Sequence, residues 1–461
     1  MNIVICAPEV FPFAKTGGLA DVTGALPLAL EELGQNVVIF MPKYRQVSEG
    51  KWQLNKLKNG LYFTKIGKDI KVYFIEHQTY YNRQGLYGEK AGDYPDNLER
   101  FSFFCRKTLD FLRDIEFKPD IIHIHDWQSS LVAVYLKTVY KGITFYKDIK
   151  VLLTIHNIGY QGLFPKEEFS KLGLNWSLFN IEGLEFYDQI NLLKGGIIFS
   201  DAINTVSPTY SKEIQTKEFG FGLEGVLRKK SDRLYGILNG IDYNVWNPQT
   251  DKLIFKNYSE SNFSAKYENK INLQKICNLA PRDVAIFGLV SRLAEQKGWD
   301  ILAEAIDELC NLDLELVILG TGDIRYHNLL EEISKRYPKV CSVNLRFDEI
   351  LAHRIYAGSD IFLMPSKYEP CGLGQMISLR YGTVPLVFKT GGLADTVTEE
   401  NGFVFDSYTK EALIAKVKEA IATYKDKSKW VKLIKRAFSY NFSWQDSAKK
   451  YLELYQKILN F

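Results

Sequence analysis

Short apolar runs rich in β-branched residues alternate with helical patterns along this chain, in two separate series. The runs of the first series lie at 2–7, 36–40, 71–75, 120–124, 151–155 and 202–206, and those of the second at 284–290, 314–319, 360–364 and 385–388. Such runs, ending in polar or glycine-bearing loops, are typical of buried parallel strands. The alternation predicts an α/β fold with two doubly wound, Rossmann-like sheets.

A polar stretch separates the two series. It begins with NGIDYNVWNP at 239–248, continues to about residue 280 and has few periodic apolar residues. With 461 residues, 46% of them hydrophobic, the chain is also too long for one compact core. We expect one domain over 1–240 and a second over 241–440, and we expect the segment 441–461 to return as a helix to the first domain.

The balance of charges excludes several partners. Fifty-eight basic and 55 acidic residues leave a net charge of +3, with no long block of one sign. Neither a nucleic-acid-binding tract nor a polybasic membrane arm is indicated. Without an export signal or a membrane-spanning apolar run, we expect a cytoplasmic protein. The six cysteines show no C-x-x-C spacing, so we expect reduced thiols and no zinc site.

The heptapeptide KTGGLAD occurs twice, at 15–21 and at 389–395. Each copy follows an expected strand and precedes or opens a helix, where ligands of open parallel sheets bind. The glycines let backbone N–H groups approach an anion, the helix N-terminus favours negative charge, and lysine adds a cation. The repeat predicts one ligand-binding loop in each domain, facing each other across a cleft. The alternative is a tight strand-to-helix turn without a ligand.

The motif SRLAEQKG places Arg292 and Lys297 between a strand and a helix of the second series. Two cations at a helix N-terminus suit a diphosphate. A leaving nucleoside diphosphate gains negative charge as its bond to carbon breaks, so the two cations would stabilise the transition state more than the ground state. The alternative is an ordinary pair of basic residues on an exposed loop.

The motif MPSKYEPCGLGQ forms another strand-to-helix junction. Pro370 keeps Glu369 in an extended conformation outside the helix. We therefore expect the Glu369 carboxylate to point into the cleft and to accept hydrogen bonds from sugar hydroxyls. Cys371 has no Cys–His signature beside it, so we interpret it as a packed thiol that lines the pocket.

The motifs HIHDWQ and TIHN end two strands of the first series. His123, His125 and Asp126 suggest a metal site, but Asp126 would lie on the opposite side of the pleat if the strand continued, and no other ligand follows at a familiar spacing. We therefore expect no metal. We interpret Asp126 and His156 as polar groups that contact a carbohydrate, and Trp127 as a ring face on which a sugar stacks. His123 and His125 are interpreted as core histidines with satisfied hydrogen bonds.

Taken together, these motifs resemble those of the bacterial glycogen synthase and plant starch synthase family of retaining glycosyltransferases. The matching blocks occur in family order over nearly the whole chain: KTGGLADV, HDWQ, HNIGYQG, NGIDYNVWNP, SRLAEQKG, EPCGLGQ, RYGTVPLV and KTGGLADTV. The resemblance implies a GT-B fold, in which two Rossmann-like domains face a central cleft. It also implies glucose transfer from ADP-glucose to the non-reducing end of glycogen or a malto-oligosaccharide, with retention and without a metal or other cofactor.

The resemblance implies roles for individual residues as well. Arg292, Lys297, Lys15 and Gly18 would contact the diphosphate, Phe347 would lie beside the adenine, and Tyr87 would contact the acceptor. Asp126, His156 and Asn239 would face the glucose, and Glu369 with the backbone of Cys371 and Gly372 would bind its hydroxyls. The expected catalytic residues are Asp126, His156, Arg292, Lys297 and Glu369, and the expected substrate-binding residues are Lys15, Gly18, Asp21, Tyr87, Trp127, Asn239, Phe347, Cys371, Gly372, Lys389, Gly391 and Gly392.

The chain departs from related patterns at two positions. Gly374 stands where the family often has Ser or Thr, which removes a hydroxyl contact to phosphate. Ile377 stands where sucrose- and mannose-type relatives carry a second glutamate. Two other functions stay open at this point: a binding protein that kept the cleft and lost turnover, and a phosphorylase with a lysine-bound pyridoxal cofactor. The choice of ADP-glucose over UDP-glucose rests on the resemblance alone.

Overall fold

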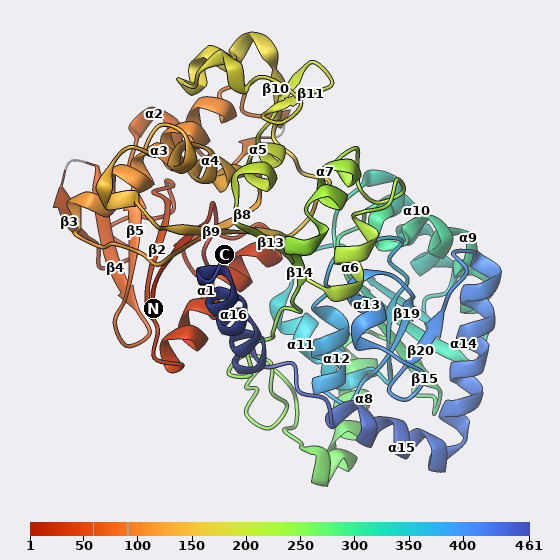
Figure 1. The fold of residues 1–461 in the computed structure, drawn as a ribbon. Coiled ribbons are helices and arrows are strands. Elements are labelled where there is room, and N and C mark those ends of the chain that lie inside the picture. The colour runs from red at the N-terminus through yellow and green to blue at the C-terminus, as the bar shows by residue number, and fades with distance from the viewer. Residues whose placement is uncertain (59, 90–91) are drawn as a thin grey trace. The chain divides into compact units, whose positions relative to one another are not determined.

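The structure, a computed structural model, describes residues 1–58, 60–89 and 92–461 and divides into two compact units (Figure 1). Unit 1 comprises Met1–Gly240 and Trp444–Phe461, and unit 2 comprises Ile241–Ser443. Each unit contains a mainly parallel sheet against which helices pack. The predicted α/β class with two doubly wound sheets is confirmed.

Unit 1 is built on a nine-stranded sheet in the order β14-β13-β9-β8-β1-β2-β5-β4-β3. Its strands are β1 Asn2–Cys6, β2 Asn36–Pro42, β3 Asn55–Lys58, β4 Leu61–Ile66, β5 Ile70–Ile75, β8 Ile121–His125, β9 Lys150–Ile155, β13 Ala202–Thr205 and β14 Leu234–Gly236. Only the β3–β4 and β4–β5 pairs are antiparallel among these. The central strands are buried, as their continuous apolar runs require.

The chain order of this sheet defines a switch point between β1 and β8. From β1 the chain moves outward through β2 and β5, and it then returns to β8 on the other side of β1. Ligands of doubly wound folds bind at the carboxyl ends of the strands beside such a point. The loop after β1 and the start of the helix after β8 therefore lie where a ligand is expected.

The helices of unit 1 pack around this sheet. They are α1 Gly18–Glu32, α2 Gln78–Tyr81, α3 Asn97–Asp114, α4 Asp126–Lys137, α5 Leu192–Phe199, α6 Pro208–Glu213, α7 Glu224–Lys229 and α16 Trp444–Leu459. The last helix, α16, lies beside α1 (Figure 1), so the end of the chain completes the unit in which the chain begins. Unit 1 also contains a hairpin of β6 Gly88–Glu89 with β7 Gly92–Asp93, and a small sheet of β10 Leu163–Pro165, β12 Gln189–Asn191 and β11 Glu185–Phe186.

Unit 2 is built on a six-stranded parallel sheet in the order β17-β16-β15-β18-β19-β20. Its strands are β15 Ala285–Val290, β16 Leu314–Leu319, β17 Cys341–Asn344, β18 Ile361–Met364, β19 Val384–Phe388 and β20 Phe403–Phe405. The chain moves from β15 to β17 and then returns to β18 on the other side of β15. The switch point of this sheet therefore lies between β15 and β18.

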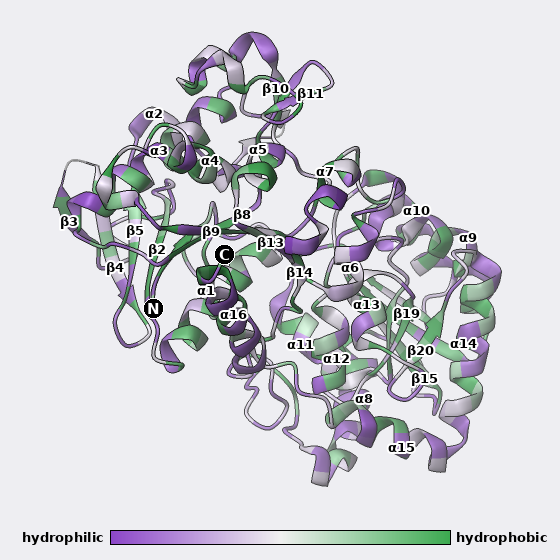
Figure 2. Ribbon diagram, in the orientation of Figure 1, coloured by the Kyte–Doolittle hydropathy of each residue, from purple (hydrophilic) through white to green (hydrophobic). Residues whose placement is uncertain are grey.

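Eight α-helices accompany the sheet of unit 2. They are α8 Lys266–Ile276, α9 Trp299–Cys310, α10 Ile324–Arg336, α11 Glu349–Gly358, α12 Gly374–Arg380, α13 Gly391–Thr396, α14 Lys410–Lys425 and α15 Lys427–Phe438. Figure 2 shows hydrophobic residues concentrated on the strands and hydrophilic residues on helices such as α15 and α16. Within the described ranges, no helix is both long and apolar enough to cross a membrane.

Candidate active site

The first copy of KTGGLAD joins β1 to α1 in unit 1, and its first four residues are exposed. A Cβ atom placed on Gly17 or Gly18 would meet none of the described atoms within 4 Å, so the N-terminus of α1 is open to an anion. Lys15 Nζ donates to Asp21 Oδ1 at 2.6 Å, and its side chain is 47% exposed. Burial raises the pKa of Asp21, against the lowering effect of Lys15. An exposed ammonium in such a pair can exchange its carboxylate for a phosphate.

Glu9 organises this loop, although no motif in the sequence pointed to this residue. Its buried carboxylate accepts hydrogen bonds from the Thr16 backbone N–H, from Thr16 Oγ1 at 2.6 Å and from the Tyr87 hydroxyl at 2.6 Å. Burial raises the pKa of Tyr87, so this hydroxyl stays a donor. Glu9 thus fixes the loop that carries Lys15 and links it to Tyr87. The signal in the sequence was an acidic residue three positions beyond the apolar run of β1.

Asp126 follows β8 directly and begins α4. Its backbone has φ +54°, in the left-handed region that residues other than glycine rarely adopt and that often marks functional positions. Its Oδ1 accepts a hydrogen bond from the backbone N–H of His156 at 2.7 Å. Burial raises the pKa of Asp126 to about 7, against the lowering effect of the N–H groups of His156 and Asn157. The carboxyl group can therefore exchange a proton near neutral pH.

Three histidines, His123, His125 and His156, lie close to Asp126 and to one another. His123 is fully buried and bonds to the Tyr455 hydroxyl at 2.8 Å and to Thr154 Oγ1 at 2.7 Å, as a core histidine would. His125 Nδ1 lies 2.9 Å from His156 Nε2, while His125 Nε2 has no hydrogen-bond partner in the described part of the chain. Burial lowers the pKa of His156 and of His123 to about 3, so both rings are neutral. His125 therefore orients His156, a role that the sequence did not reveal.

The structure corrects the interpretation of Trp127. This ring is 8% exposed and packs edge-on against Phe101 and Phe164, with centroid distances of 5.0 and 5.9 Å. A Cβ atom on Gly162, where φ is +65°, would lie 2.5 Å from the ring, so the backbone covers it closely. Trp127 is a core residue beneath the loop after β9, and a sugar cannot stack on a face that the protein already covers.

In unit 2, the loops after β15 and β18 meet at the switch point. Lys297 Nζ donates to Glu369 Oε2 at 2.6 Å, and Ser366 Oγ donates to the same oxygen at 3.0 Å. The side chains of Lys297 and Glu369 are 17% and 8% exposed. Arg292 lies on the same loop as Lys297 and is exposed. Lys297 and Glu369, which are expected to bind different parts of a donor, thus form one ion pair here. If either side chain were removed, the charge of the other would lose its partner.

The second copy of KTGGLAD joins β19 to α13 and is packed differently from the first. A Cβ atom on Gly391 would lie 2.0 Å from the carbonyl oxygen of Glu369, and one on Gly392 would lie 2.1 Å from that of Cys371. The Gly392 N–H donates to the Glu369 carbonyl at 3.1 Å. These contacts correct the expectation that the glycine pair is open to a ligand, because the loop after β18 occupies that space. Lys389 is exposed.

The remaining predicted residues lie as follows. Phe347 precedes α11 and is 88% exposed, so its ring is available to a ligand. Cys371 is buried, and Gly372 has φ +73°. Asn239 is 6% exposed, and its Oδ1 has no hydrogen-bond partner among the residues the structure describes. Direct contacts therefore join Lys15 to Asp21 and Asp126 to His156 in unit 1, and Lys297 to Glu369 in unit 2.

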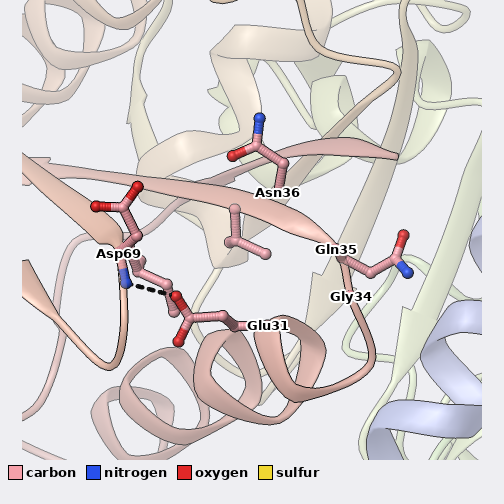
Figure 3. Close-up of a pocket in the computed structure, with 7 residues that line it drawn as sticks. Glu31, Gly34, Gln35, Asn36 and Asp69 are labelled. Atoms are coloured by element: carbon pink, nitrogen blue, oxygen red, sulfur yellow. Dashed lines mark hydrogen bonds between the residues drawn. The ribbon is translucent and has the colours of Figure 1, made fainter.

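Two further observations delimit the site. Nowhere in residues 1–58, 60–89 and 92–461 do three His, Cys, Asp or Glu side chains group in a way that could hold a metal ion. A surface hollow of unit 1 lies at the end of α1 and the start of β2 (Figure 3), where Glu31 Oε1 accepts a hydrogen bond from the Asp69 N–H at 2.7 Å. The hollow lies at the amino end of β2, and no predicted site residue lines it.

Comparisons with known proteins cover the whole chain. Residues 2–229 match the family model of the starch synthase catalytic domain, and residues 272–437 match that of glycosyl transferases group 1. The glycogen synthase of Geotalea uraniireducens is 50% identical over 480 residues, and that of Thermotoga maritima is 46% identical over 486 residues. Both matches cover 100% of this chain and 99% of the relative.

Solved structures give the same result. The catalytic domain of Starch Synthase IV from Arabidopsis thaliana, bound to ADP and acarbose, matches with a TM-score of 0.90 and 34% identity. The match covers 100% of this chain and 99% of that one. The sucrose-phosphate synthase of Thermosynechococcus elongatus, at 17% identity and a TM-score of 0.64, shares the fold alone.

Proposed function

The chain belongs to the glycogen and starch synthase family of glycosyltransferases, and we propose that it transfers glucose from ADP-glucose to the non-reducing end of an α-1,4-glucan with retention of configuration. A nucleotide-sugar donor and a glucan acceptor are the substrates of this family. The choice of ADP-glucose is supported by the likeness to the starch synthase that was solved with ADP.

The observation that carries the proposal is the contact between Lys297 and Glu369 at the switch point of unit 2. A diphosphate that binds Arg292 and Lys297 would draw the Lys297 ammonium away from Glu369. The freed carboxylate would then accept hydrogen bonds from the glucose hydroxyls. The same two cations would neutralise the charge that develops on the leaving diphosphate, which lowers the barrier to transfer.

We assign complementary roles to unit 1. Lys15 and the exposed amides of Gly17 and Gly18 would add positive charge for the leaving diphosphate. Asp126 and the neutral His156 ring would bind the hydroxyls of the transferred glucose, with His125 holding the ring in place. Tyr87, held by Glu9, would contact the acceptor.

We further propose that transfer proceeds without a covalent glucosyl-enzyme. Retaining hydrolases that use such an intermediate have two carboxyl groups about 5 Å apart, one of them a nucleophile. Here the two candidate carboxylates belong to different units, Asp126 to unit 1 and Glu369 to unit 2, and Asp126 already accepts the backbone N–H of His156. In the proposed reaction the leaving phosphate accepts the proton of the attacking hydroxyl on the same face of the sugar. A glucosylated Asp126 or Glu369, detected by mass spectrometry of quenched enzyme, would refute this mechanism.

A nucleotide-release assay tests the function directly. ADP-glucose and UDP-glucose are supplied separately, with and without glycogen, and release of the nucleoside diphosphate is followed together with growth of the glucan. We expect release from ADP-glucose that depends on glycogen and persists in EDTA, with slower release from UDP-glucose. Glycogen binding without release would favour a binding protein. Glucan cleavage that requires inorganic phosphate, together with a pyridoxal absorbance band, would favour a phosphorylase.

A cytoplasmic location is part of the same proposal. All six cysteines are buried thiols, which fits a reducing compartment. Fractionation of cells that produce the native protein would test it, with recovery in the cytoplasmic fraction as the expected result.

A further inference from the structure

Three exposed aromatic side chains of unit 1 lie on the loop that carries His156 and on two further loops of the same unit. Tyr160 is 57% exposed, Phe221 is 51% exposed and Tyr187 is 80% exposed. They come from the loop after β9, the loop before α7 and the turn between β11 and β12. We call these three residues the aromatic strip. None of them has a part in the donor chemistry proposed above.

Two glycines show which loops the rings lie against. A Cβ atom on Gly159, next to Tyr160, would lie 3.8 Å from the ring of Phe221. A Cβ atom on Gly222, next to Phe221, would lie 3.5 Å from the ring of Tyr187. The Phe221 ring therefore lies beside the loop that carries Tyr160, and the Tyr187 ring lies beside the loop that carries Phe221, although the three residues are separated in the chain.

A single buried amide holds two of these loops to the body of the unit. Gln161 Nε2 donates to the carbonyl oxygens of Ile158 at 3.2 Å and Phe221 at 3.0 Å, and Gln161 Oε1 accepts from Asn191 Nδ2 at 2.6 Å. Gln161 is 7% exposed, so water competes little for these bonds. The backbone at Phe221 is thus held to the loop that carries His156.

The backbone of the strip is strained at two of its three residues. Tyr187 has φ +48° and Phe221 has φ +51°, and large side chains rarely adopt this left-handed region. Asparagine or glycine would suit both positions better. Residues held in such strained backbone conformations cluster at binding and catalytic sites.

We propose that the aromatic strip binds the α-1,4-glucan acceptor, with the three rings stacking against the apolar faces of successive glucose units that lead away from His156. An aromatic face is an apolar surface with a negative quadrupole, which suits the C–H groups of a pyranose ring. Lys166 and Asp188, paired beside Tyr187, offer charged hydrogen-bonding groups for the hydroxyls. The inference rests on the proposed function, because it names the path of that reaction's acceptor on unit 1.

The test removes rings without adding strain. Tyr187→Asn and Phe221→Asn keep a residue that tolerates the left-handed backbone. Tyr267→Asn in α8 of unit 2 is the matched control, since Tyr267 is 56% exposed and lies outside the strip. Binding to glycogen and maltoheptaose is measured by affinity electrophoresis and calorimetry, and KM and kcat are measured with glycogen as acceptor.

We expect the dissociation constant and the KM for the glucan to rise about three- to tenfold for each ring removed. The kcat at saturating glycogen, the KM for the nucleotide sugar and all parameters of Tyr267→Asn should stay unchanged. The melting temperature of the strip variants should equal or exceed that of the wild type, because strain is relieved. This result would separate lost acceptor binding from damaged folding.

Unchanged glucan affinity in both strip variants would overturn the inference. A wild-type dimer that these substitutions dissociate, with glucan affinity retained, would also overturn it and identify the strip as an interface between copies of the chain. The proposed function fails separately. A wild-type protein that binds glycogen through the strip but releases no nucleotide would support the strip and refute the glucosyl transfer.

Discussion

The two copies of KTGGLAD share seven letters and the same place between a parallel strand and a helix, yet their surroundings differ. In unit 1 the residues from Lys15 to Gly18 are exposed. In unit 2 the residues from Thr390 to Gly392 are buried. The glycines of the first copy have open space above them, whereas those of the second touch backbone carbonyl oxygens.

The neighbouring strand explains the difference. In unit 1 the strand beside β1 is β8, and α4 begins at Asp126 directly after β8 ends at His125. In unit 2 the strand beside β19 is β18, and the residues 365–373 form a loop before α12. This loop packs onto the second copy, while no comparable loop follows β8. The packing of the repeat is therefore set by the connection next to it and not by its seven residues.

The largest expected effect is at Lys15. Lys15→Ala removes the exposed ammonium of the first copy and should lower kcat/KM at least about a hundredfold, because a transition-state charge contact is worth about 2.7–4 kcal/mol. Steady-state kinetics with ADP-glucose and glycogen measure this, with circular dichroism to establish folding. A folded variant that keeps more than a tenth of wild-type kcat/KM would mean that the first copy does not serve the reaction.

The next largest effect concerns the pH dependence of stability and is expected at Asp126, where α4 begins directly after β8. Its pKa is raised to about 7 in the folded state, so the folded protein binds more protons than the unfolded chain between about pH 4 and pH 7. The Asp126 carboxyl therefore makes the wild type less stable as the pH rises through this range. Asp126→Asn lacks this titration and keeps an oxygen that can accept the His156 N–H.

The free energy of unfolding of Asp126→Asn, minus that of the wild type, should consequently increase by up to about 4 kcal/mol as the pH rises from about 4 to 8. Urea denaturation at several pH values measures the difference, and the titrations of the buried histidines are common to both proteins. Parallel stability curves would contradict the raised pKa.

The smallest expected effect is at Lys389, the counterpart of Lys15. Its exposed ammonium belongs to a copy whose backbone is packed against the 365–373 loop. Lys389→Ala should lower kcat/KM by no more than about fivefold, since exposed charges contribute about 0–1 kcal/mol. The same kinetic assay applies, and a loss as large as that of Lys15→Ala would make the two copies equivalent in function.

The sequence predicted the parts of the molecule that depend on local pattern. Buried parallel strands appear as apolar runs, so both sheets and the loops that carry Asp126, Arg292 and Glu369 could be located. The packing of Gly391 and Gly392 could not, because it depends on how the loop after a neighbouring strand folds back. The pattern of a single loop contains no information about that contact.

The same reason explains the other differences. The sequence could not reveal that the Trp127 ring is covered. Gly162, which lies against the ring, is distant in the sequence and meets it only in the folded unit. Glu9 and His125 act through hydrogen bonds to residues on other loops, which no spacing reveals. The aromatic strip joins three loops, and its members are ordinary aromatic residues when each is considered alone.

One pair of substitutions tests the central comparison most directly: Gly18→Ala and Gly392→Ala, with the melting temperature and kcat/KM measured for both. Gly18→Ala should leave the melting temperature unchanged or raise it, because the new methyl group meets open space at the start of a helix, and should lower kcat/KM about tenfold by obstructing an anion. Gly392→Ala should lower the melting temperature by about 3–10 °C, because its Cβ would lie 2.1 Å from the Cys371 carbonyl oxygen. Equal melting temperatures for the two variants, or full activity of Gly18→Ala, would contradict the account.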